Sequence, residues 1–579
     1  MSFFGFYKNR LKDNQVVQNS DMDRKRAVQG WCMYDWANSA FSTSVSTAIM
    51  PVYFVVLFQN AFGNDVSFLN FEFTGSSTWS LAVAISTAIV AFSSPVLGTI
   101  ADRTQIKKTL LFIYTLTGSL FTIMSFFSVF SGAEWAWILG CFMIANIGFA
   151  GGFVFYNSFL PYLGNDDELD RISSRGYAYG YVGGGLLLAI HLGAIQFFSD
   201  SNHLDLVTRI CITSVGIWWF GWAIWTFKTV PEPQISNPVS GLTFSTSIKI
   251  AFNTLSKTFN ELTKFKILLM YLVAYLLFND GIQTVLTVAG AFGPDTLGIS
   301  LISNMVTILI VQFVAAIGAI LFSKLASLIG AKQSLSITLL GWVIVIALAV
   351  GFAPLSPESH HDYDYQIEYS KTGQYEISTK PELPEDQHFS IKWKGSVGDL
   401  IDKDYLSRSQ VLELLTAIRE FEDSKFSISI IGGDLDETKA VGINHRSVLQ
   451  GGPIDWWPRA LRNHIWEPLK LAVDTQWLIL GIMVGTVLGG SQALARSLFA
   501  NMTPESRSAE FFSFFGFVGR ASAVFGPMVY LVFTGIFDTR VAILIILCLI
   551  IAGYLLLRTI DVEQGRAVAL EEDRLFKSS

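Results

Sequence analysis

Long apolar runs dominate this chain, and they constrain its fold more than any other feature. A helical run of about 20 residues, rising about 1.5 Å per residue, crosses a hydrocarbon core of roughly 30 Å. The chain is 51% apolar and only 15% charged, which excludes a soluble globular protein of 579 residues. We therefore predict an integral membrane protein with twelve helical spans, at 29–58, 78–101, 109–131, 135–160, 175–199, 207–230, 265–291, 299–325, 334–353, 472–496, 509–535 and 540–559.

Basic residues divide unevenly between the loops. Lys and Arg precede the first span and follow spans two, four, six, eight and twelve, whereas the loops 59–77, 132–134, 200–206 and 292–298 contain none. Because Lys- and Arg-rich loops stay in the cytoplasm, we predict that both termini are cytoplasmic. The polar N-terminal segment shows no cleavable signal peptide. The external insertion described below has no Asn-x-Ser/Thr sequon, and these features favour a bacterial inner membrane over a vacuolar membrane.

Two polar segments divide the chain, one after the sixth span and one after the ninth. Residues 179–184 (YGYVGG) and 515–520 (FGFVGR) repeat one pattern six spans apart, which is typical of two parallel six-helix repeats that rock about a central site. The predicted parts are an N-terminal segment (1–28), a first bundle (29–231), a cytoplasmic linker (232–263), a second bundle (264–355 and 466–560), an extracytoplasmic insertion (356–465) and a cytoplasmic tail (561–579).

The insertion has patterns of its own. Residues 365–369 and 374–377 alternate between polar and apolar side chains, which predicts a β-hairpin. A helical period at 404–422 and a strand pattern at 426–431 follow. We therefore predict a small α+β domain on the extracytoplasmic side.

Charged side chains interrupt some of the apolar runs. Asp35 lies near the start of the first span, and Asp280 lies near the middle of the seventh. A charge at the centre of a bilayer costs about 2.5 kcal/mol or more, so such residues are rarely kept without a role. Asp280 has either a substrate or proton role or a structural one. The same two alternatives hold for Asp35, where the structural interpretation is the stronger. Arg520 is also deep, and it either binds a carboxylate or neutralises Asp280.

The loop after the second span reads Gly98-Thr99-Ile100-Ala101-Asp102-Arg103-Thr104-Gln105-Ile106-Lys107-Lys108. It resembles the glycine–aspartate–arginine–basic loop motif of the major facilitator superfamily. Two departures are Gln105, where that motif has glycine, and a final basic pair that comes one residue late. Asp102 can interact favourably with the positive N-terminal end of a neighbouring helix. The resemblance implies that this neighbour is span eleven and that the loop latches one conformation; an ordinary cytoplasmic loop is the alternative.

Four further stretches narrow the resemblance. In chain order they are 34–41 (YDWANSAF), 173–181 (SSRGYAYGY), 279–284 (NDGIQT) and 490–499 (GSQALARSLF), the last followed by 509–512 (AEFF). They resemble the autophagy-related vacuolar effluxer family and its bacterial relatives. The resemblance implies an all-α membrane protein with the major facilitator fold, in which twelve transmembrane helices form two six-helix bundles. Its fungal members are thought to export amino acids from the vacuole.

We expect two groups of functional residues. The substrate or coupling group contains Asp280, Arg520, Asp35, Asn38, Gln283, Thr284, Asn157 and Gln492. The gate or latch group contains Gly98, Asp102, Arg103, Lys107, Lys108, Arg175, Arg496 and Glu510. In the second group, Arg175 and Arg496 are gate residues or lipid-facing anchors, and we expect Glu510 to pair with one of them. His191 is interpreted as a hydrogen-bonded core residue.

Other classes of function find no support in the sequence. A Gly-rich nucleotide loop and a nucleophile–base constellation are both missing, so we expect neither ATP-driven transport nor an enzyme. The four cysteines fall in or beside apolar spans without metal or disulfide spacing. Residues 360–364 (HHDYD) are interpreted as a solvated linker, with a metal site as the alternative. We therefore expect no cofactor and no resident metal.

The sequence thus predicts a secondary transporter of a small polar solute, with amino acids as the first class to consider. It would work by alternating access, and proton coupling would run through Asp280, whose pKa burial could raise. Its partners would be membrane lipid and the solute, and the chain lacks the basic face that nucleic acid would need. The alternative is a membrane-anchored receptor or assembly protein whose insertion binds an external partner.

Overall fold

Backbone groups inside a bilayer have no water to bond, so an apolar run of this length satisfies them by forming a helix. A computed structural model describes residues 21–62, 65–68, 71–127, 133–199, 201–234, 265–297, 299, 301–371, 373–381, 387–421, 424–449, 452, 454–536 and 539–578. Residues 1–20 of the predicted N-terminal segment and residues 235–263 of the predicted linker lie outside this part of the chain.

The N-terminal half begins with one long bent helix. It comprises α2 (Asp21–Ala40), a π-helical segment η1 (Phe41–Ile49) and α3 (Met50–Phe62), and a short hairpin of β1 (Asp65–Phe68) and β2 (Phe71–Thr74) follows it. The π-helical turns come directly after the buried residues Asp35 and Asn38, and such turns often mark functional positions. The remaining helices of this half are α4 (Gly75–Thr104), α5 (Lys107–Met124), α6 (Glu134–Ser158), α7 (Asp166–Phe197) and α8 (Leu204–Thr229).

The C-terminal half contains α10 (Lys266–Leu297), α11 (Leu301–Ile329), α12 (Ala331–Val350), α16 (Val473–Asn501), α17 (Ser508–Ile536) and α18 (Thr539–Thr559). A last helix, α19 (Val562–Ser578), turns away by 66°. Among the described residues, ten helices are long and apolar enough to cross a membrane, or eleven if the bent pair α18 and α19 counts as one span.

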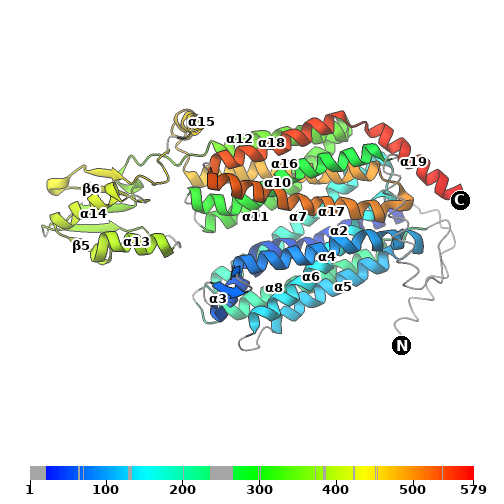
Figure 1. Cartoon of the computed structure of the whole chain (residues 1–579), viewed down its shortest axis with the longest axis horizontal. Helices are drawn as coiled ribbons and strands as arrows, with labels where there is room; N and C mark the ends of the chain where they lie inside the picture. The colour runs from blue at the N-terminus through cyan, green and yellow to red at the C-terminus, as the bar shows by residue number, and fades with distance from the viewer. Residues whose placement is uncertain are drawn as a thin grey trace.

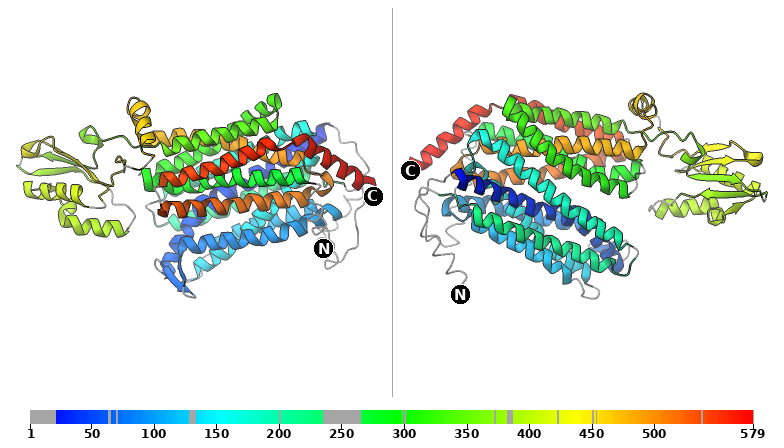
Figure 2. Two further views of the ribbon diagram at one scale, coloured as in Figure 1. Left: turned by 45° about the horizontal axis from the view of Figure 1, so that its top comes forward. Right: turned by 180° about the vertical axis from the view of Figure 1, so that it is seen from behind.

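The two halves lie side by side along the long axis of the molecule (Figure 1). The start of α2 and the whole of α19 lie at one end of the bundle, which we call the terminal end, and the insertion lies beyond the other end, which we call the insertion end. Both views of Figure 2 show the halves meeting at the terminal end and diverging toward the insertion end. The contacts that can close a pathway between the halves are therefore to be sought at the terminal end.

Glycines allow the helices within each half to approach closely. A Cβ on Gly148 of α6 would lie 2.5 Å from the Cα of Gly118 in α5, so these two backbones are in contact. Gly180 and Gly184 of α7 face Ser39 and Thr43 of the first span in the same way. Small residues at four-residue spacing are the usual means by which membrane helices pack.

The insertion folds around a hydrophobic core separate from that of the membrane helices. Its five-stranded sheet has the order β5-β4-β3-β6-β7, and β3 and β6 are parallel. The elements are β3 (Tyr365–Tyr369), β4 (Tyr375–Thr379), α13 (Gln387–Val397), β5 (Tyr405–Leu406), α14 (Arg408–Glu420), β6 (Ser427–Ile431) and β7 (Lys439–Val441). A short helix, α15 (Trp456–Leu461), connects this domain to the bundle, and the Trp457 indole donates to the backbone of Ala347 in α12.

Candidate functional site

A buried arginine joins the two halves near the terminal end. Arg496 of α16 is fully buried, and its Nη1 lies 3.3 Å from a carboxylate oxygen of Asp35 in α2. Its Nε donates to the Ser173 hydroxyl of α7 at 2.9 Å, and its Nη2 donates to the Ser173 carbonyl at 2.7 Å. The Asn157 side chain of α6 accepts from Nη1 at 3.2 Å. One arginine of the C-terminal half therefore contacts three helices of the N-terminal half.

Aromatic rings enclose this guanidinium. Its Cζ lies 4.0 Å from the centre of the Tyr177 ring and 4.8 Å from the Trp31 ring, distances at which a cation is attracted to an aromatic face. Tyr156 of α6 also donates a 2.8 Å hydrogen bond to Asp35. The ion pair is therefore both shielded from water and hydrogen-bonded, which is the condition under which a buried pair can persist.

A second inter-half contact involves the loop after α4. Asp102 accepts hydrogen bonds from the backbone N–H groups of Ala509 and Glu510, at 3.0 and 2.8 Å, and so caps the first turn of α17. Lys107 lies 2.7 Å from Asp102 and donates to the Ser508 hydroxyl at 2.8 Å. The neighbour that the resemblance implied for Asp102, span eleven, is the helix that Asp102 caps in this structure.

Gly98 lies one turn before Asp102, where α4 crosses α17. A Cβ on this residue would lie 2.6 Å from the carbonyl oxygen of Ala509, so only glycine fits without displacing the backbone of α17. Gln105 stands where the family loop has glycine, and its φ of 55° lies in the left-handed region that glycine adopts most easily. The departure noted in the sequence therefore falls at a position where the backbone itself favours glycine.

Other predicted gate residues lie elsewhere. Glu510 in the first turn of α17 pairs at 2.9 Å with Arg507, three residues earlier in the 3-10 turn that precedes the helix, whereas the sequence suggested Arg175 or Arg496 as the partner. Arg175 is exposed and lies over the ring of Tyr179 one turn further along α7. Arg103 is half-buried, and Lys108 donates to the backbone carbonyl of Val230 at 2.6 Å.

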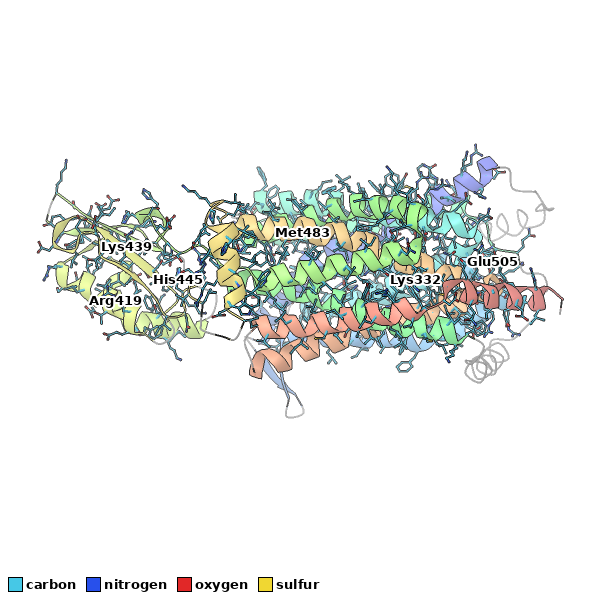
Figure 3. All side chains as sticks on the ribbon, turned by 90° about the horizontal axis from the view of Figure 1, so that it is seen from above. Lys332, Arg419, Lys439, His445, Met483 and Glu505 are labelled. Atoms are coloured by element: carbon cyan, nitrogen blue, oxygen red, sulfur yellow. The ribbon has the colours of Figure 1, made fainter. Side chains whose placement is uncertain are left out.

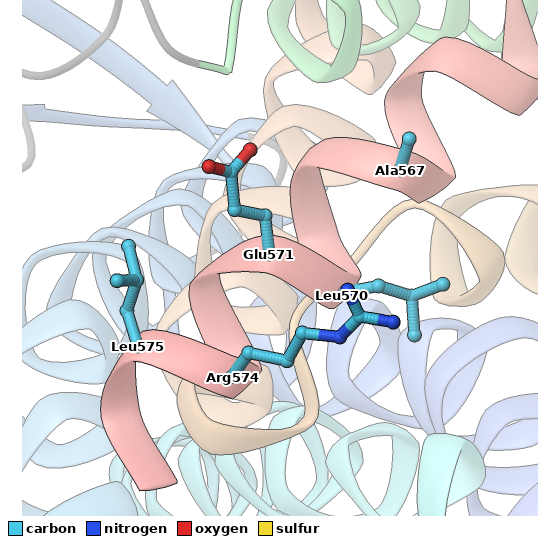
Figure 4. A pocket seen from close by; sticks show the side chains of 5 residues that line it. All are labelled: Ala567, Leu570, Glu571, Arg574 and Leu575. Carbon is cyan, nitrogen blue, oxygen red and sulfur yellow. The ribbon is translucent and has the colours of Figure 1, made fainter. Parts of the chain in front are cut away.

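The C-terminal helix supports the segment that contacts Asp102. Asp573 of α19 accepts from the backbone N–H groups of Glu505 and Ser506, both at 2.9 Å, and Glu572 lies 3.3 Å from Arg507. Figure 3 places Glu505 at the terminal end beside α19. The opposite face of α19 carries a shallow pocket of about 630 Å³ (Figure 4), lined by Ala567, Leu570, Glu571, Arg574 and Leu575.

Several predicted substrate residues lie deeper in the C-terminal half. Asn279 of α10 donates to the Ser522 hydroxyl of α17 at 2.6 Å and accepts from Gln492 of α16 at 3.1 Å. Asp280 is 3% exposed, and its backbone carbonyl accepts from Thr284 at 2.6 Å, while Gln283 is half-buried beside them. These amides and hydroxyls join three helices in one polar layer.

Arg520 does not form the predicted ion pair with Asp280. Its Nη2 donates to the backbone carbonyl of Ala150 in α6 at 2.6 Å, which is a further contact between the halves. Among the described residues no ion pair includes Arg520. Its Nη1 lies beside Gly516, one turn back along α17, as is usual for long side chains on helices.

The N-terminal half holds two more of the predicted polar residues. Asn38 is 1% exposed, and its Nδ2 has no hydrogen-bond partner among the described residues. His191 bonds to Ser44 and Ser214 through its two ring nitrogens, as expected for a satisfied core residue. Asp35, in contrast, is an inter-half ion-pair partner, a role that the sequence did not suggest.

Sequence reasoning missed the set of residues around Arg496. Ser173 and Tyr177 fall within a stretch already singled out for its motif, but Trp31 and Tyr156 carried no signal of their own. The available signal was an aspartate and an arginine near the cytoplasmic ends of different spans, and helix packing was needed to show that they meet.

The described residues contain no group of three or more His, Cys, Asp or Glu side chains that could hold a metal ion. The segment predicted as a solvated linker is folded: His360–Asp362 form a 3-10 turn, and Asp364 accepts from the Ser427 hydroxyl at 2.7 Å. Figure 3 places His445, which lies 3.2 Å from Asp364, on the side of the insertion nearest the bundle.

Comparison with known proteins supports the predicted major facilitator fold of the membrane bundle. A family model described as "Vacuole effluxer Atg22 like" matches residues 23–356 and 464–570 and leaves out the insertion. The chain is 28% identical over 324 residues to the uncharacterized MFS-type transporter YxiO of Bacillus subtilis, covering 55% of this chain and 72% of that protein. It is 20% identical to autophagy-related protein 22 of Kluyveromyces lactis, covering 94% of this chain and 95% of that protein.

Solved structures extend the comparison to the fold. The human organic anion transporter MFSD10 has a TM-score of 0.52 and 11% identity, covering 92% of this chain and 99% of that one. The proton:xylose symporter XylE, a member of the major facilitator superfamily, has a TM-score of 0.53 and 13% identity, covering 92% of this chain and 94% of that one. At such identities the likeness shows a shared fold, which is that of the major facilitator superfamily.

Proposed function

The chain belongs to the vacuole effluxer Atg22-like family of major facilitator transporters, and we propose that it moves a small polar solute by alternating access. The premise is that the chain transports small solutes and is not an enzyme. The contact between Arg496 and Asp35 is the observation that carries this proposal. It is a buried, water-excluded ion pair between the halves, and the halves can separate there only by breaking it.

In this proposal the terminal end is closed and the insertion end is open. The Arg496 network forms the inner closure, and the Asp102–Lys107 contact with the start of α17 forms the outer one. Both contacts include discrete polar bonds, which can be exchanged for bonds to water when the halves rock apart. The same bonds give the closed state a defined geometry.

The topology that fits this mechanism has twelve spans, with α17 and α18 as the eleventh and twelfth. Both termini would be cytoplasmic, in line with the basic residues of the loops at the terminal end. The α+β insertion would then be extracytoplasmic. We propose a bacterial inner membrane as the location, and efflux as the direction of transport.

We propose amino acids as the solute class and protons as the coupling ion, with Asp280 as the coupling residue. Asp280 is buried in a polar layer of the C-terminal half, and the protonation of such a group responds to the opening of a water path.

Proteoliposomes containing the purified chain test this proposal. We expect counterflow of at least one amino acid, driven faster by an inward proton gradient. Asp280→Asn should keep counterflow but lose the response to the proton gradient, while the exposed Asp399→Asn should behave as the wild type. A lack of protein-dependent counterflow for every amino acid would contradict the solute class, and an unchanged proton response in Asp280→Asn would contradict the coupling role.

A further inference from the structure

Arg520 is half-buried, and only part of its guanidinium has a hydrogen-bond partner among the described residues. It is 12 residues beyond the first residue of α17, about 18 Å along the helix at about 1.5 Å per residue, and thus deeper than the contact that Asp102 makes at Ser508–Glu510. One guanidinium nitrogen, Nη2, donates to the Ala150 carbonyl at 2.6 Å. The other, Nη1, is buried and has no hydrogen-bond partner among the described residues.

Two other arginines of the C-terminal half have carboxylate partners that neutralise their charge. Arg496 has the carboxylate of Asp35, and Arg507 has the carboxylates of Glu510 and Glu572. Both of those arginines lie closer to the terminal end. Arg520 has a single neutral carbonyl instead. A carbonyl does not neutralise a buried cation, and an uncompensated charge in the interior is unfavourable, so the site favours the arrival of an anion.

The surroundings of Arg520 supply polar atoms. Gly516 has no side chain beside the guanidinium, and a Cβ there would lie 3.4 Å from a side-chain carbon of Val154 and 3.8 Å from Nη1. A Cβ on Gly519 would lie 3.0 Å from the hydroxyl oxygen of Tyr275. The carbonyl of Gly519 accepts from the Asn279 amide, which links this spot to the polar layer containing Gln492.

We propose that Arg520 anchors the anionic group of the transported solute, and that this group is a carboxylate. The planar guanidinium fork matches two carboxylate oxygens, which a lysine or an amide cannot reproduce. The proposal rests on the transporter function proposed above, and it adds the residue that recognises the solute and the chemistry that it recognises.

The bond between Arg520 and Ala150 also depends on how the two halves are arranged. Arg520 belongs to the C-terminal half and Ala150 to the N-terminal half, so the bond between them exists only while the halves are close at this depth. A carboxylate bound to Nη1 lowers the energy of the guanidinium in this state. When the halves separate there, the Ala150 bond is lost and the carboxylate becomes the remaining partner of the arginine.

Matched pairs of probes test the anchor in proteoliposomes with the full chain. The panel contains each amino acid and its C-terminal amide, which differ in the carboxylate alone. The wild type should transport at least one acid and discriminate against its amide by about tenfold or more, the factor that a lost charge-assisted bond brings. Arg520→Gln should abolish that preference, and Arg520→Lys should raise KM by about tenfold with the preference partly kept. Arg558→Gln, an exposed arginine of α18, serves as the control and should match the wild type.

The outcomes separate the two proposals. Equal transport of acid and amide by the wild type, or an unchanged KM for the acid in Arg520→Lys, would overturn the anchor while leaving the transporter intact. Transport of no panel member by the wild type would overturn both the anchor and the proposed amino-acid solute class. Arg520→Lys keeps the positive charge, so it provides a second variant if Arg520→Gln does not fold.

Discussion

At the scale of single residues, the closure at the terminal end depends on polar atoms that are buried and fully engaged. Arg496 makes bonds to a carboxylate, a hydroxyl, a carbonyl and an amide at once. Removing one partner of a buried ion pair leaves the other charge uncompensated and costs about 3–5 kcal/mol. Asp35 and Arg496 are therefore expected to tolerate substitution less well than the exposed Arg175.

Gly98 gives the sharpest single-residue test. Gly98→Ala places a methyl group 2.6 Å from the backbone oxygen of Ala509, so α17 must move away from Asp102. Overpacking of this kind costs about 1–3 kcal/mol, and here it destabilises the closed state alone. The thiol of Cys32 provides the readout, because it is fully buried and lies three residues before Asp35, on the same face of α2.

In a background where Cys141, Cys211 and Cys548 are replaced by serine, Gly98→Ala should speed labelling of Cys32 by an impermeant maleimide added at the terminal side. Gly140→Ala is the matched control, since a Cβ there would meet nothing within 4 Å. Equal labelling rates in the two variants would show that the close approach of α4 and α17 does not hold the closure.

At the scale of elements, two parts outside the spans depend on caps. Helix α19 uses Asp573 to cap the turn that precedes α17, and so supports the segment that Asp102 contacts. In the insertion, Asp364 accepts from the backbone N–H of Ser427 at 2.8 Å and lies 3.2 Å from the ring of His445. Burial raises the pKa of Asp364, but the hydrogen bonds of His445 and Ser427 outweigh it and hold the pKa below its usual value.

This lowered pKa predicts a pH dependence for the stability of the insertion. Because the folded pKa lies below the unfolded pKa of about 3.9, the stabilisation is complete above that value and is lost as the pH falls through the folded pKa. Asp364→Asn should therefore lower the free energy of unfolding by about 1.5–3 kcal/mol near neutral pH and by much less in strong acid.

Denaturant unfolding of the isolated segment 354–466, followed by tryptophan fluorescence, measures this difference. The segment is suitable because its core is separate from that of the bundle. Asp399→Asn, which changes an exposed aspartate of the 3-10 turn Gly398–Asp402, is the control. A penalty of equal size at neutral and acid pH would contradict the role given to the Asp364 carboxylate.

At the scale of the whole molecule, we expect transport to be separable from the insertion. Arg462 bonds to the backbone of Ser447 at 2.7 Å and to the side chain of Ser356 at 3.5 Å, so the two ends of the insertion meet at one guanidinium. Replacing residues 357–446 with a short Gly-Ser linker should therefore leave the bundle folded and keep solute counterflow at the level of the full chain.

Two measurements on the shortened chain distinguish the classes of function. Retained counterflow supports a transporter whose insertion is an accessory domain. Loss of counterflow from a chain that still elutes as a single species would contradict this separation and would favour the alternative, in which the insertion carries the function.

The sequence and the structure contribute differently to the candidate site. The loop motif at Gly98–Lys108 could be found from sequence because one loop carries all of its residues, and the family resemblance, not the pattern itself, implied that Asp102 contacts span eleven. Asp35 and Arg496 are 461 positions apart, and no pattern within either span shows that they meet. For Arg520 the sequence left two alternatives, binding a carboxylate or neutralising Asp280, for the same reason: depth along a helix can be counted from sequence, but the direction in which a side chain points depends on packing.

The sequence alone determined the class of the protein, because a bilayer leaves an apolar run no alternative to a helix, and the repeated motifs six spans apart indicated two related halves. Only the tertiary structure decided which charges neutralise one another and which do not. Those pairings depend on the rotation and crossing of helices, and these are set by contacts such as those of Gly98, Gly118 and Gly148 between backbones far apart in the chain.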